Sequence, residues 1–379
     1  MDALTTPSNW QRVRLGDIAE IKRGVRITKN ELDVFGKYPV VSGGVGFLGY
    51  TNNFNRYENT ITIAQYGTAG YVNFQKNKFW ANDVCFCIYP NKDIIKNIFL
   101  YYFLKVNQNY LYEISNRNAT PYSISKDKIL DFEIPLPPLN EQIAIANILS
   151  DVDRYLYSLD ALILKKEGVK KALSFELLSQ RKRLKGFNQA WQRVKVKDFG
   201  TIITGSTPLT QISEYWNGTI SWITPTDIND NKDIFNSERK ITQKGLDTIR
   251  MIPKNSVLVT CIASIGKNAI LRVNGACNQQ INAIIPNKDF NADFIYYLME
   301  NNKQHLLGKA GVTATYIISK QVFEEIDFFV PKDLNEQIAI ANILSGLDHE
   351  ITSLKNKKRQ FENIKKALNH DLMSAKIRV

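Results

Sequence analysis

The stretch LNEQIAIANILS fills residues 139–150 and returns, letter for letter, at residues 334–345. Pro135, Pro137 and Pro138 precede the first copy, and Pro331 precedes the second. Proline lacks a backbone N–H donor and restricts the residue before it, so we expect the chain to arrive extended and to enter a helix at each copy. The repeated helix start predicts an internal duplication.

Further landmarks of this duplication keep the same order in both halves. The matched segments are Trp10–Val13 with Trp191–Val194, Pro90–Asp93 with Pro286–Asp289, and Tyr101-Tyr102 with Tyr296-Tyr297. Between these landmarks the two halves differ strongly, which predicts a shared scaffold with divergent loops. Such a division suits a protein that reads two different targets.

The residues after each copy predict a long helix with a coiled-coil seam. Apolar residues alternate at spacings of four and three, at Ile145, Leu149, Val152, Leu156, Leu159 and Ile163, and again at Ile340, Leu344, Leu347, Ile351 and Leu354. The first helix could run on the order of 60 Å at ~1.5 Å per residue, a length that calls for a similar partner. The alternative is a pair of amphipathic helices on a globular core. Lys358 replaces Ile163 in the second seam and weakens the far end of the predicted pairing.

The regions before the two helices, residues 9–135 and 188–331, read as mixed β structure with some helix. Thr60–Ala64 and Ser256–Thr260 are short β-rich runs between turn residues. Ile94–Val106 and Ala292–Met299 have the character of short helices.

The composition favours a polyanionic partner and offers no catalytic constellation. The net charge is +12 and the pI about 9.3, which on phosphate backbones contributes affinity through counterion release. Four cysteines without a Cys-x-x-Cys motif are expected to be small core residues, and the three histidines lack partners at catalytic or metal-ligand spacing. No apolar run approaches the ~20 residues that cross a bilayer. We therefore expect a soluble, cytoplasmic chain without a membrane partner.

The order and duplication of the motifs resemble the specificity subunit of type I restriction-modification systems, over nearly the whole chain. The resemblance is carried by Pro135–Pro138 leading into LNEQIA, by Leu15-Gly16-Asp17 after the opening Trp-x-x-Val, and by Tyr38–Gly44, Ala64–Val72, Gly205–Pro208, Tyr215-Trp216 and Trp222–Ile228.

This resemblance implies an α+β fold in which two mixed α/β target-recognition domains are separated by two long antiparallel helices that form a coiled coil, with an internal pseudo-two-fold repeat. The expected bounds are 1–138 for the first recognition domain, 139–187 for the first helical spacer, 188–333 for the second domain and 334–379 for the second spacer.

The resemblance also implies the partners. Each domain would read one half of a bipartite double-stranded DNA target, and the helices would set the gap. Two modification (methyltransferase) subunits would dock on the helices, and restriction (endonuclease and translocase) subunits would join them. S-adenosylmethionine, ATP and Mg²⁺ are expected in those partners, and no cofactor or metal in this chain.

Two sets of residues are predicted to make contacts. The predicted DNA-binding residues are basic residues and short polar loop residues, of the kind that approach phosphates and bases: Lys22, Arg23, Ser42, Gly43, Gly44, Tyr66, Thr68, Asn116, Arg117, Asn118, Thr120, Lys126, Ser206, Thr207, Thr224, Thr226, Asp227, Ser264, Lys309, Thr313, Thr315 and Lys320. The predicted partner-binding residues are polar and identical in both copies: Glu141, Gln142 and Asn147, with Glu336, Gln337 and Asn342. Their alternative role is helix capping or contact within the chain.

Two other functions stay open at this point. One is a coiled-coil scaffold that binds protein only, for which DNA affinity should be absent. The other is a chain that itself modifies DNA, against which the missing methyltransferase and nuclease motifs argue.

Overall fold

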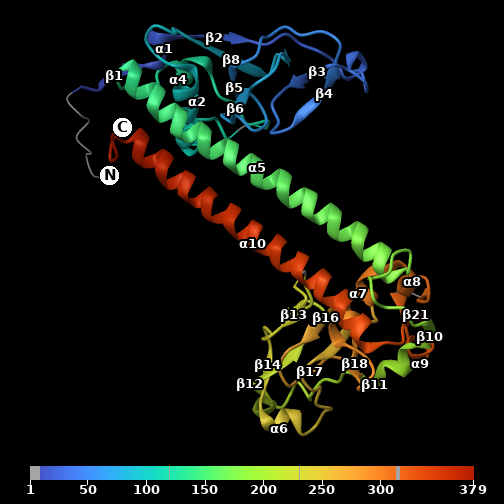
Figure 1. The fold of residues 1–379 in the computed structure, drawn as a ribbon. Helices are drawn as coiled ribbons and strands as arrows, with labels where there is room; N and C mark the ends of the chain where they lie inside the picture. The colour runs from blue at the N-terminus through green and yellow to red at the C-terminus, as the bar shows by residue number, and fades with distance from the viewer. Residues whose placement is uncertain (1–8, 119, 230, 313–315) are drawn as a thin grey trace. The chain divides into compact units, whose positions relative to one another are not determined.

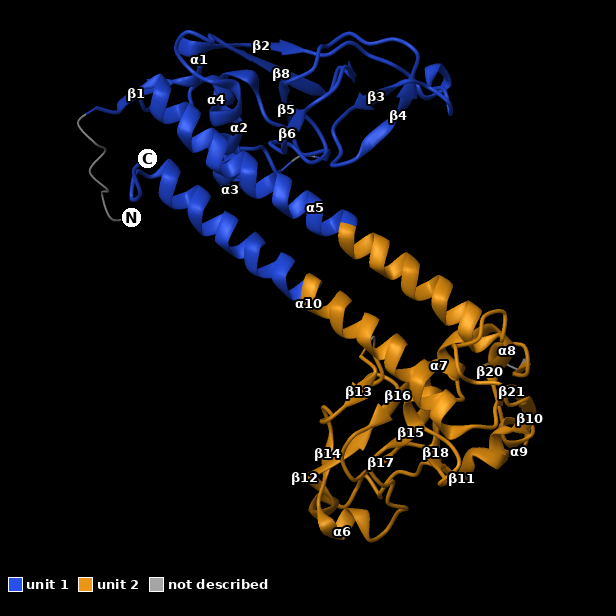
Figure 2. Ribbon diagram, viewed as in Figure 1, with its two compact units in different colours: residues 1–161, 355–379 blue, residues 162–354 orange. Residues whose placement is uncertain are grey.

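The computed structural model describes residues 9–118, 120–229, 231–312 and 316–379. The chain divides into unit 1, residues 1–161 with 355–379, and unit 2, residues 162–354 (Figure 2). The two long helices, α5 (Leu139–Leu178) and α10 (Leu334–Met373), each contribute residues to both units. None of the helices in the described ranges is long and apolar enough to cross a membrane.

The described residues of unit 1 form small β-sheets and short helices that precede α5 in the chain (Figure 1). Its strands pair in the orders β1 (Gln11–Arg14) with β9 (Glu133–Leu136); β2 (Ala19–Arg23), β8 (Cys85–Pro90), β5 (Thr60–Ala64), β6 (Val72–Gln75); and β4 (Phe47–Thr51), β3 (Tyr38–Val41), β7 (Trp80–Ala81). Its short helices are α1 (Leu15–Ile18), η1 (Lys29–Glu31), α2 (Asn97–Val106), α3 (Gln108–Glu113) and α4 (Lys126–Leu130).

Unit 2 repeats this topology with additions. Its strands pair in the orders β10 (Trp191–Lys195) with β21 (Asp327–Pro331); β11 (Gly200–Thr204), β18 (Ile281–Pro286), β15 (Ser256–Thr260), β16 (Asn268–Leu271), β13 (Asp233–Ile234); β14 (Lys240–Ile241), β12 (Trp216–Ile223), β17 (Gly275–Cys277); and β19 (Gly311–Val312) with β20 (Tyr316–Ile317). Its short helices are η2 (Val196–Phe199), η3 (Ser213–Tyr215), α6 (Gln243–Leu246), α7 (Ala292–Asn301), α8 (Lys303–Leu307) and α9 (Lys320–Glu324). The shared order of β2-β8-β5-β6 and β11-β18-β15-β16 confirms the duplication predicted from the sequence.

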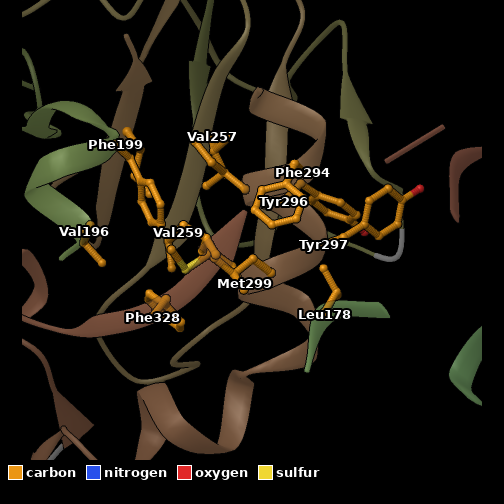
Figure 3. Packing of buried hydrophobic residues seen from close by; sticks show 14 of the residues in the cluster. Leu178, Val196, Phe199, Val257, Val259, Phe294, Tyr296, Tyr297, Met299 and Phe328 are labelled. Carbon is orange, nitrogen blue, oxygen red and sulfur yellow. The ribbon is translucent and has the colours of Figure 1, made fainter. Parts of the chain in front are cut away.

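The predicted strands and helices are found near their expected positions. Every residue of β5 and β15 is buried, as expected for central strands covered on both faces. In unit 2, Phe294 and Tyr297 of α7 belong to one buried core with Val257 and Val259 of β15 and with Phe199 and Phe328 (Figure 3). In unit 1 the predicted helix begins at Asn97 rather than Ile94, because Lys96 is still extended, with ψ of 132°.

The long helices pack on each other within each unit and also enter the cores. In unit 1, the Tyr155 and Phe361 rings lie 4.6 Å apart between centroids, and Lys358 pairs with Asp160 at 2.6 Å. In unit 2, Lys166 pairs with Glu350 at 2.7 Å. Since rising residue numbers on α5 meet falling numbers on α10, the helices run antiparallel in both units. Lys358 therefore stays at the helix interface as half of an ion pair.

The ends of the long helices are buried in the cores of the two units. Ile145 and Leu149 near the start of α5 belong to the unit 1 core, together with Leu372 and Met373 at the end of α10. The equivalent residues of unit 2 are Ile340 and Leu344 from α10, with Leu177 and Leu178 from α5. Both sequence interpretations of the helices thus hold, each over a different part of their length.

Candidate nucleic-acid interface

Three loops of unit 1 are held together by backbone hydrogen bonds: the β3–β4 turn, the β5–β6 turn and the segment before α4. The Thr68 backbone N–H and hydroxyl both donate to the Gly43 carbonyl, at 2.9 and 2.7 Å. The Gly67 N–H donates to the Tyr122 carbonyl at 3.1 Å. A Cβ on Gly43 would lie 2.3 Å from the Tyr66 carbonyl oxygen, so this close approach requires glycine.

Unit 2 contains the same connection between the β15–β16 turn and the segment before α9. The Ala263 N–H donates to the Tyr316 carbonyl at 3.0 Å, and Ile262 forms an antiparallel bridge with Ile317. Ala263 has a φ of 62°, close to the 76° of Gly67. The backbone joint is therefore repeated, although the side chains around it differ.

These loops bring together a majority of the DNA contacts predicted for unit 1. The predicted residues that lie on them are Ser42, Gly43, Gly44, Tyr66, Thr68, Asn116, Arg117, Asn118 and Thr120, of which Gly44, Thr68 and the last four are exposed. In unit 2, Ser264 lies in the corresponding turn, and Lys309 is exposed after α8. Thr313 and Thr315 lie outside the described residues.

The remaining predicted contacts lie elsewhere. Lys22 and Arg23 are on β2, where Lys22 pairs with Glu20 at 3.1 Å. Lys126 and Lys320 begin the short helices α4 and α9.

The Asp227 carboxylate forms hydrogen bonds with the loop residues around it. Its carboxylate accepts hydrogen bonds from the Thr224 N–H and hydroxyl, both at 2.8 Å, and from the Glu238 N–H at 2.9 Å. The Thr224 hydroxyl also contacts that of Thr226 at 2.7 Å. These bonds stabilise the loop, and Thr226 is the exposed member of the three.

The sequence prediction missed one exposed arginine. The Arg239 guanidinium carbon lies 4.1 Å from the ring centre of Trp216 and 4.8 Å from that of Trp222. The Trp222 Nε1–H donates to the carbonyl of Ser206, a predicted contact residue beside Thr207. Strand pairing between β12 and β14 brings Arg239 to the two tryptophans. This contact joins residues that are distant in the sequence, so no local sequence pattern predicts it.

Four of the predicted partner-binding residues are buried inside the chain. Gln142 is fully buried, accepts a hydrogen bond from the Lys96 N–H at 2.7 Å, and donates to the carbonyls of Ile94 at 3.1 Å and Pro137 at 2.8 Å. Gln337 repeats this set of bonds with Asn291, Asp289 and Pro331. The identity of the two glutamines is thus explained by contact within the chain, the alternative to a partner surface.

The two glutamates are buried as well. The Trp10 Nε1–H donates to Glu141 at 3.1 Å, and the Trp191 Nε1–H donates to Glu336 at 3.2 Å. Glu336 additionally accepts two hydrogen bonds from Arg183, at 3.2 and 2.8 Å. Both carboxylates are therefore occupied by contacts within the chain, which is the alternative role that the sequence left open.

A repeated exposed face remains on the first turns of both long helices. Asn147 and Asn342 are exposed, as are Ile143 at 44% and Ile343 at 38%. The equivalent of Ile143 in the second copy is Ile338, and the equivalent of Ile343 in the first copy is Ile148; both of these equivalents are half-buried. Identical apolar and amide side chains thus reach the surface in both copies, which folding alone does not require.

In each unit a polar cluster joins a tyrosine of a short helix to both long helices. In unit 1 the Tyr102 hydroxyl donates to Asp153 of α5 at 2.7 Å, and Lys365 of α10 pairs with the same carboxylate at 2.5 Å. Burial raises the pKa of the Tyr102 hydroxyl, and its bond to Asp153 raises it further.

The corresponding cluster of unit 2 exchanges the roles of the helices. The Tyr297 hydroxyl donates to Asp348 of α10 at 2.6 Å, and Lys170 of α5 pairs with Asp348 at 2.5 Å. We call these the tyrosine–aspartate–lysine clusters.

The cysteines are core residues, as predicted. All four are buried and free, and burial raises the pKa values of Cys261 and Cys277 to about 12, so these thiols stay protonated near neutral pH. Within the described residues, no group of three or more His, Cys, Asp and Glu side chains is arranged to hold a metal.

Comparison with known proteins gives consistent relatives. The sequence model described as "Type I restriction modification DNA specificity domain" matches residues 7–166 and again 188–363. The MjaVIII specificity subunit of Methanocaldococcus jannaschii is 26% identical over 100% of this chain and 95% of its own length. The MjaIX specificity subunit of the same organism is 35% identical over 46% of this chain, but the match spans 41% of that protein.

A solved structure shares the fold. The S subunit of a type I restriction-modification system from M. genitalium superimposes with a TM-score of 0.70 and 20% sequence identity, over 97% of each chain.

Proposed function

This chain belongs to the type I restriction modification DNA specificity family, and we propose that, as the specificity subunit, it reads a bipartite DNA duplex with one half-site for each unit. Its relatives are named specificity subunits of type I restriction enzymes, and a specificity subunit recognises DNA rather than catalysing the reaction. The net charge of +12 supports contact with a phosphate backbone.

One observation supports the proposal of two DNA-reading units: the same backbone connection between loops occurs in both units, with different side chains around it. The Gly67–Tyr122 and Ala263–Tyr316 hydrogen bonds fix the same backbone connection in both units. Around it, unit 1 exposes Asn116–Asn118, whereas unit 2 exposes Lys309. Base contacts specify sequence, so equivalent frames with different side chains suit two different half-sites.

The first test is a domain exchange. Replacing residues 9–136, from before β1 to the end of β9, by those of a relative should change one half of the methylated sequence and leave the other half intact. The reciprocal exchange of residues 188–331 serves as the control and should alter the opposite half. A folded complex that loses both half-sites after one exchange would contradict the two-reader proposal.

The partners are part of the same proposal. Two modification subunits would dock on the long helices and restriction subunits would join them, with S-adenosylmethionine, ATP and Mg²⁺ bound by these partners. The support is the repeated exposed face formed by Ile143 and Asn147 on α5 and by Asn342 and Ile343 on α10. The long helices would also set the gap between the two half-sites. A chain with four residues inserted in each helix tests this, and the measurement is the spacer length of the DNA sequence that the variant selects.

The second test concerns the repeated exposed face. Ile143→Glu should remove one modification subunit from the purified complex, because a carboxylate replaces a side chain that would be covered. Ile343→Glu should remove the other subunit, and the double variant should remove both. Tyr157→Glu, at a position that is 78% exposed further along α5, is the matched control and should keep both. Unchanged stoichiometry in the folded double variant would exclude this face.

A further inference from the structure

In unit 1, the side chain of Arg117 is held in place although it is exposed. Its guanidinium carbon lies 5.2 Å from the ring centre of Tyr112 and 4.9 Å from that of Tyr122, and its Nε–H donates to the Tyr112 carbonyl at 3.1 Å. The Tyr122 carbonyl in turn accepts the Gly67 hydrogen bond, so one of the two rings belongs to the loop joint. With Nε engaged, the two terminal nitrogens remain as a fork for a ligand.

In unit 2, Arg239 is held in a comparable way by different residues. The rings of Trp216 and Trp222 meet edge to face with centroids 5.1 Å apart, and the guanidinium lies over both. Trp222 is 3% exposed, and its Nε1–H bonds to Ser206 at 3.0 Å.

The backbone beneath Arg239 is also fixed. Its carbonyl accepts hydrogen bonds from the Trp222 N–H at 3.2 Å and from the Ser237 hydroxyl at 2.6 Å. Neither guanidinium is paired with a carboxylate within the described residues. Each unit thus presents one arginine whose orientation is set by two aromatic rings and whose charge is not neutralised.

This arrangement distinguishes base reading from phosphate binding. A phosphate contact requires charge and tolerates a mobile side chain, whereas bidentate bonding to the O6 and N7 atoms of guanine requires a planar donor pair in a fixed orientation. Stacking on aromatic rings restricts the arginine before DNA arrives, so less rotamer entropy is lost on binding. Fixing a charged side chain costs rotamer entropy, and within the described residues no carboxylate partner of either arginine accounts for that cost.

We propose that Arg117 and Arg239 each read a guanine, Arg117 in the half-site of unit 1 and Arg239 in the half-site of unit 2. This inference rests on the proposed function, since it names the base that each reader selects. The two sites stand on independent contacts, because the rings, the loops and the strands that hold the two arginines are different.

The test uses the full chain in complex with its modification subunits, and a library of DNA duplexes with random half-sites. Arg117→Lys keeps the charge but removes the planar fork. It should relax one guanine position of one half-site by about 5- to 150-fold, the range that corresponds to the ~1–3 kcal/mol of a bidentate contact, and leave the other half-site unchanged. Arg239→Lys should relax one position in the opposite half-site.

Two exposed arginines that pair with carboxylates are matched controls. Arg154→Lys, beside Asp151 on α5, and Arg193→Lys, which pairs with Asp327 at 3.3 Å, should leave every base preference unchanged. Unaltered base preference in Arg117→Lys and Arg239→Lys overturns the inference. An alanine variant whose affinity falls equally for all sequences, with a salt slope reduced by about one, also overturns it and indicates a phosphate contact. If the unmodified complex selects no split sequence, the proposed function itself fails.

Discussion

Replacement of Arg183 by alanine is expected to lower the free energy of unfolding of unit 2 by about 3 kcal/mol, the lower end for breaking a buried ion pair. The Glu336 carboxylate is 1% exposed, whereas the Arg183 side chain is 26% exposed. The destabilisation therefore comes mainly from leaving the buried Glu336 carboxylate without its cationic partner. Without the arginine, Glu336 would keep a single hydrogen bond from Trp191 and remain a charge under the surface.

The measurement is denaturant unfolding combined with hydrogen exchange of the unit 2 amides, because the chain has two units and one global transition need not report on either. Lys185→Ala removes an exposed charge nearby and should change stability by less than about 0.5 kcal/mol. Adding Glu336→Gln to Arg183→Ala should recover part of the loss, since an amide costs less to bury than a carboxylate. Equal stability of Arg183→Ala and Lys185→Ala would show that the Arg183–Glu336 pair does not stabilise unit 2.

The second large effect is expected at the duplicated glutamines. Gln142→Ala should destabilise unit 1 by about 2–4 kcal/mol, because the Lys96 N–H and the carbonyls of Ile94 and Pro137 lose a buried partner together. Gln337→Ala should have a similar effect in unit 2. The readout is local amide exchange in the unit that carries the substitution.

Asn147→Ala and Asn342→Ala are the matched controls for the glutamines. Both asparagines are exposed on the same helices, so stability should change by less than about 0.5 kcal/mol. A Gln142→Ala chain that is as stable as its control but no longer retains a modification subunit would restore the partner role that the sequence suggested.

The helices could be predicted because their evidence is local: prolines stand directly before LNEQIAIANILS, and the spacing of four and three follows it. The repeat could be predicted because the same letters recur in the same order in both halves, which a single sequence shows directly. The role of Gln142 could not be predicted in the same way, since its hydrogen-bond partner Lys96 is 46 positions away and polar residues at a helix start are usually exposed. Lys358 was expected to weaken the seam, because the sequence alone does not show that Asp160 faces it.

The candidate interface shows the same limit. The loops near Gly43 and Thr68 were identified by residue type, and the structure brings them together through the Thr68 N–H and hydroxyl, which both donate to the Gly43 carbonyl. Arg239 was missed because its significance depends on Trp216 and Trp222, which reach it only through strand pairing. Contacts made across a sheet are set by tertiary structure, and a single sequence carries no direct signal of them.

The tyrosine–aspartate–lysine clusters bear on how such a protein acquires new preferences. Tyr102 and Tyr297 are the recognition-domain members of the clusters, and the aspartate and lysine of each belong to the long helices. A domain inherited from another lineage needs to bring this tyrosine, a tryptophan at the place of Trp10 or Trp191 and a matching apolar surface in order to make the same contacts with the helices. On the proposed function, recombination between genes would therefore exchange one DNA-reading domain and leave the helices and the subunits docked on them unchanged.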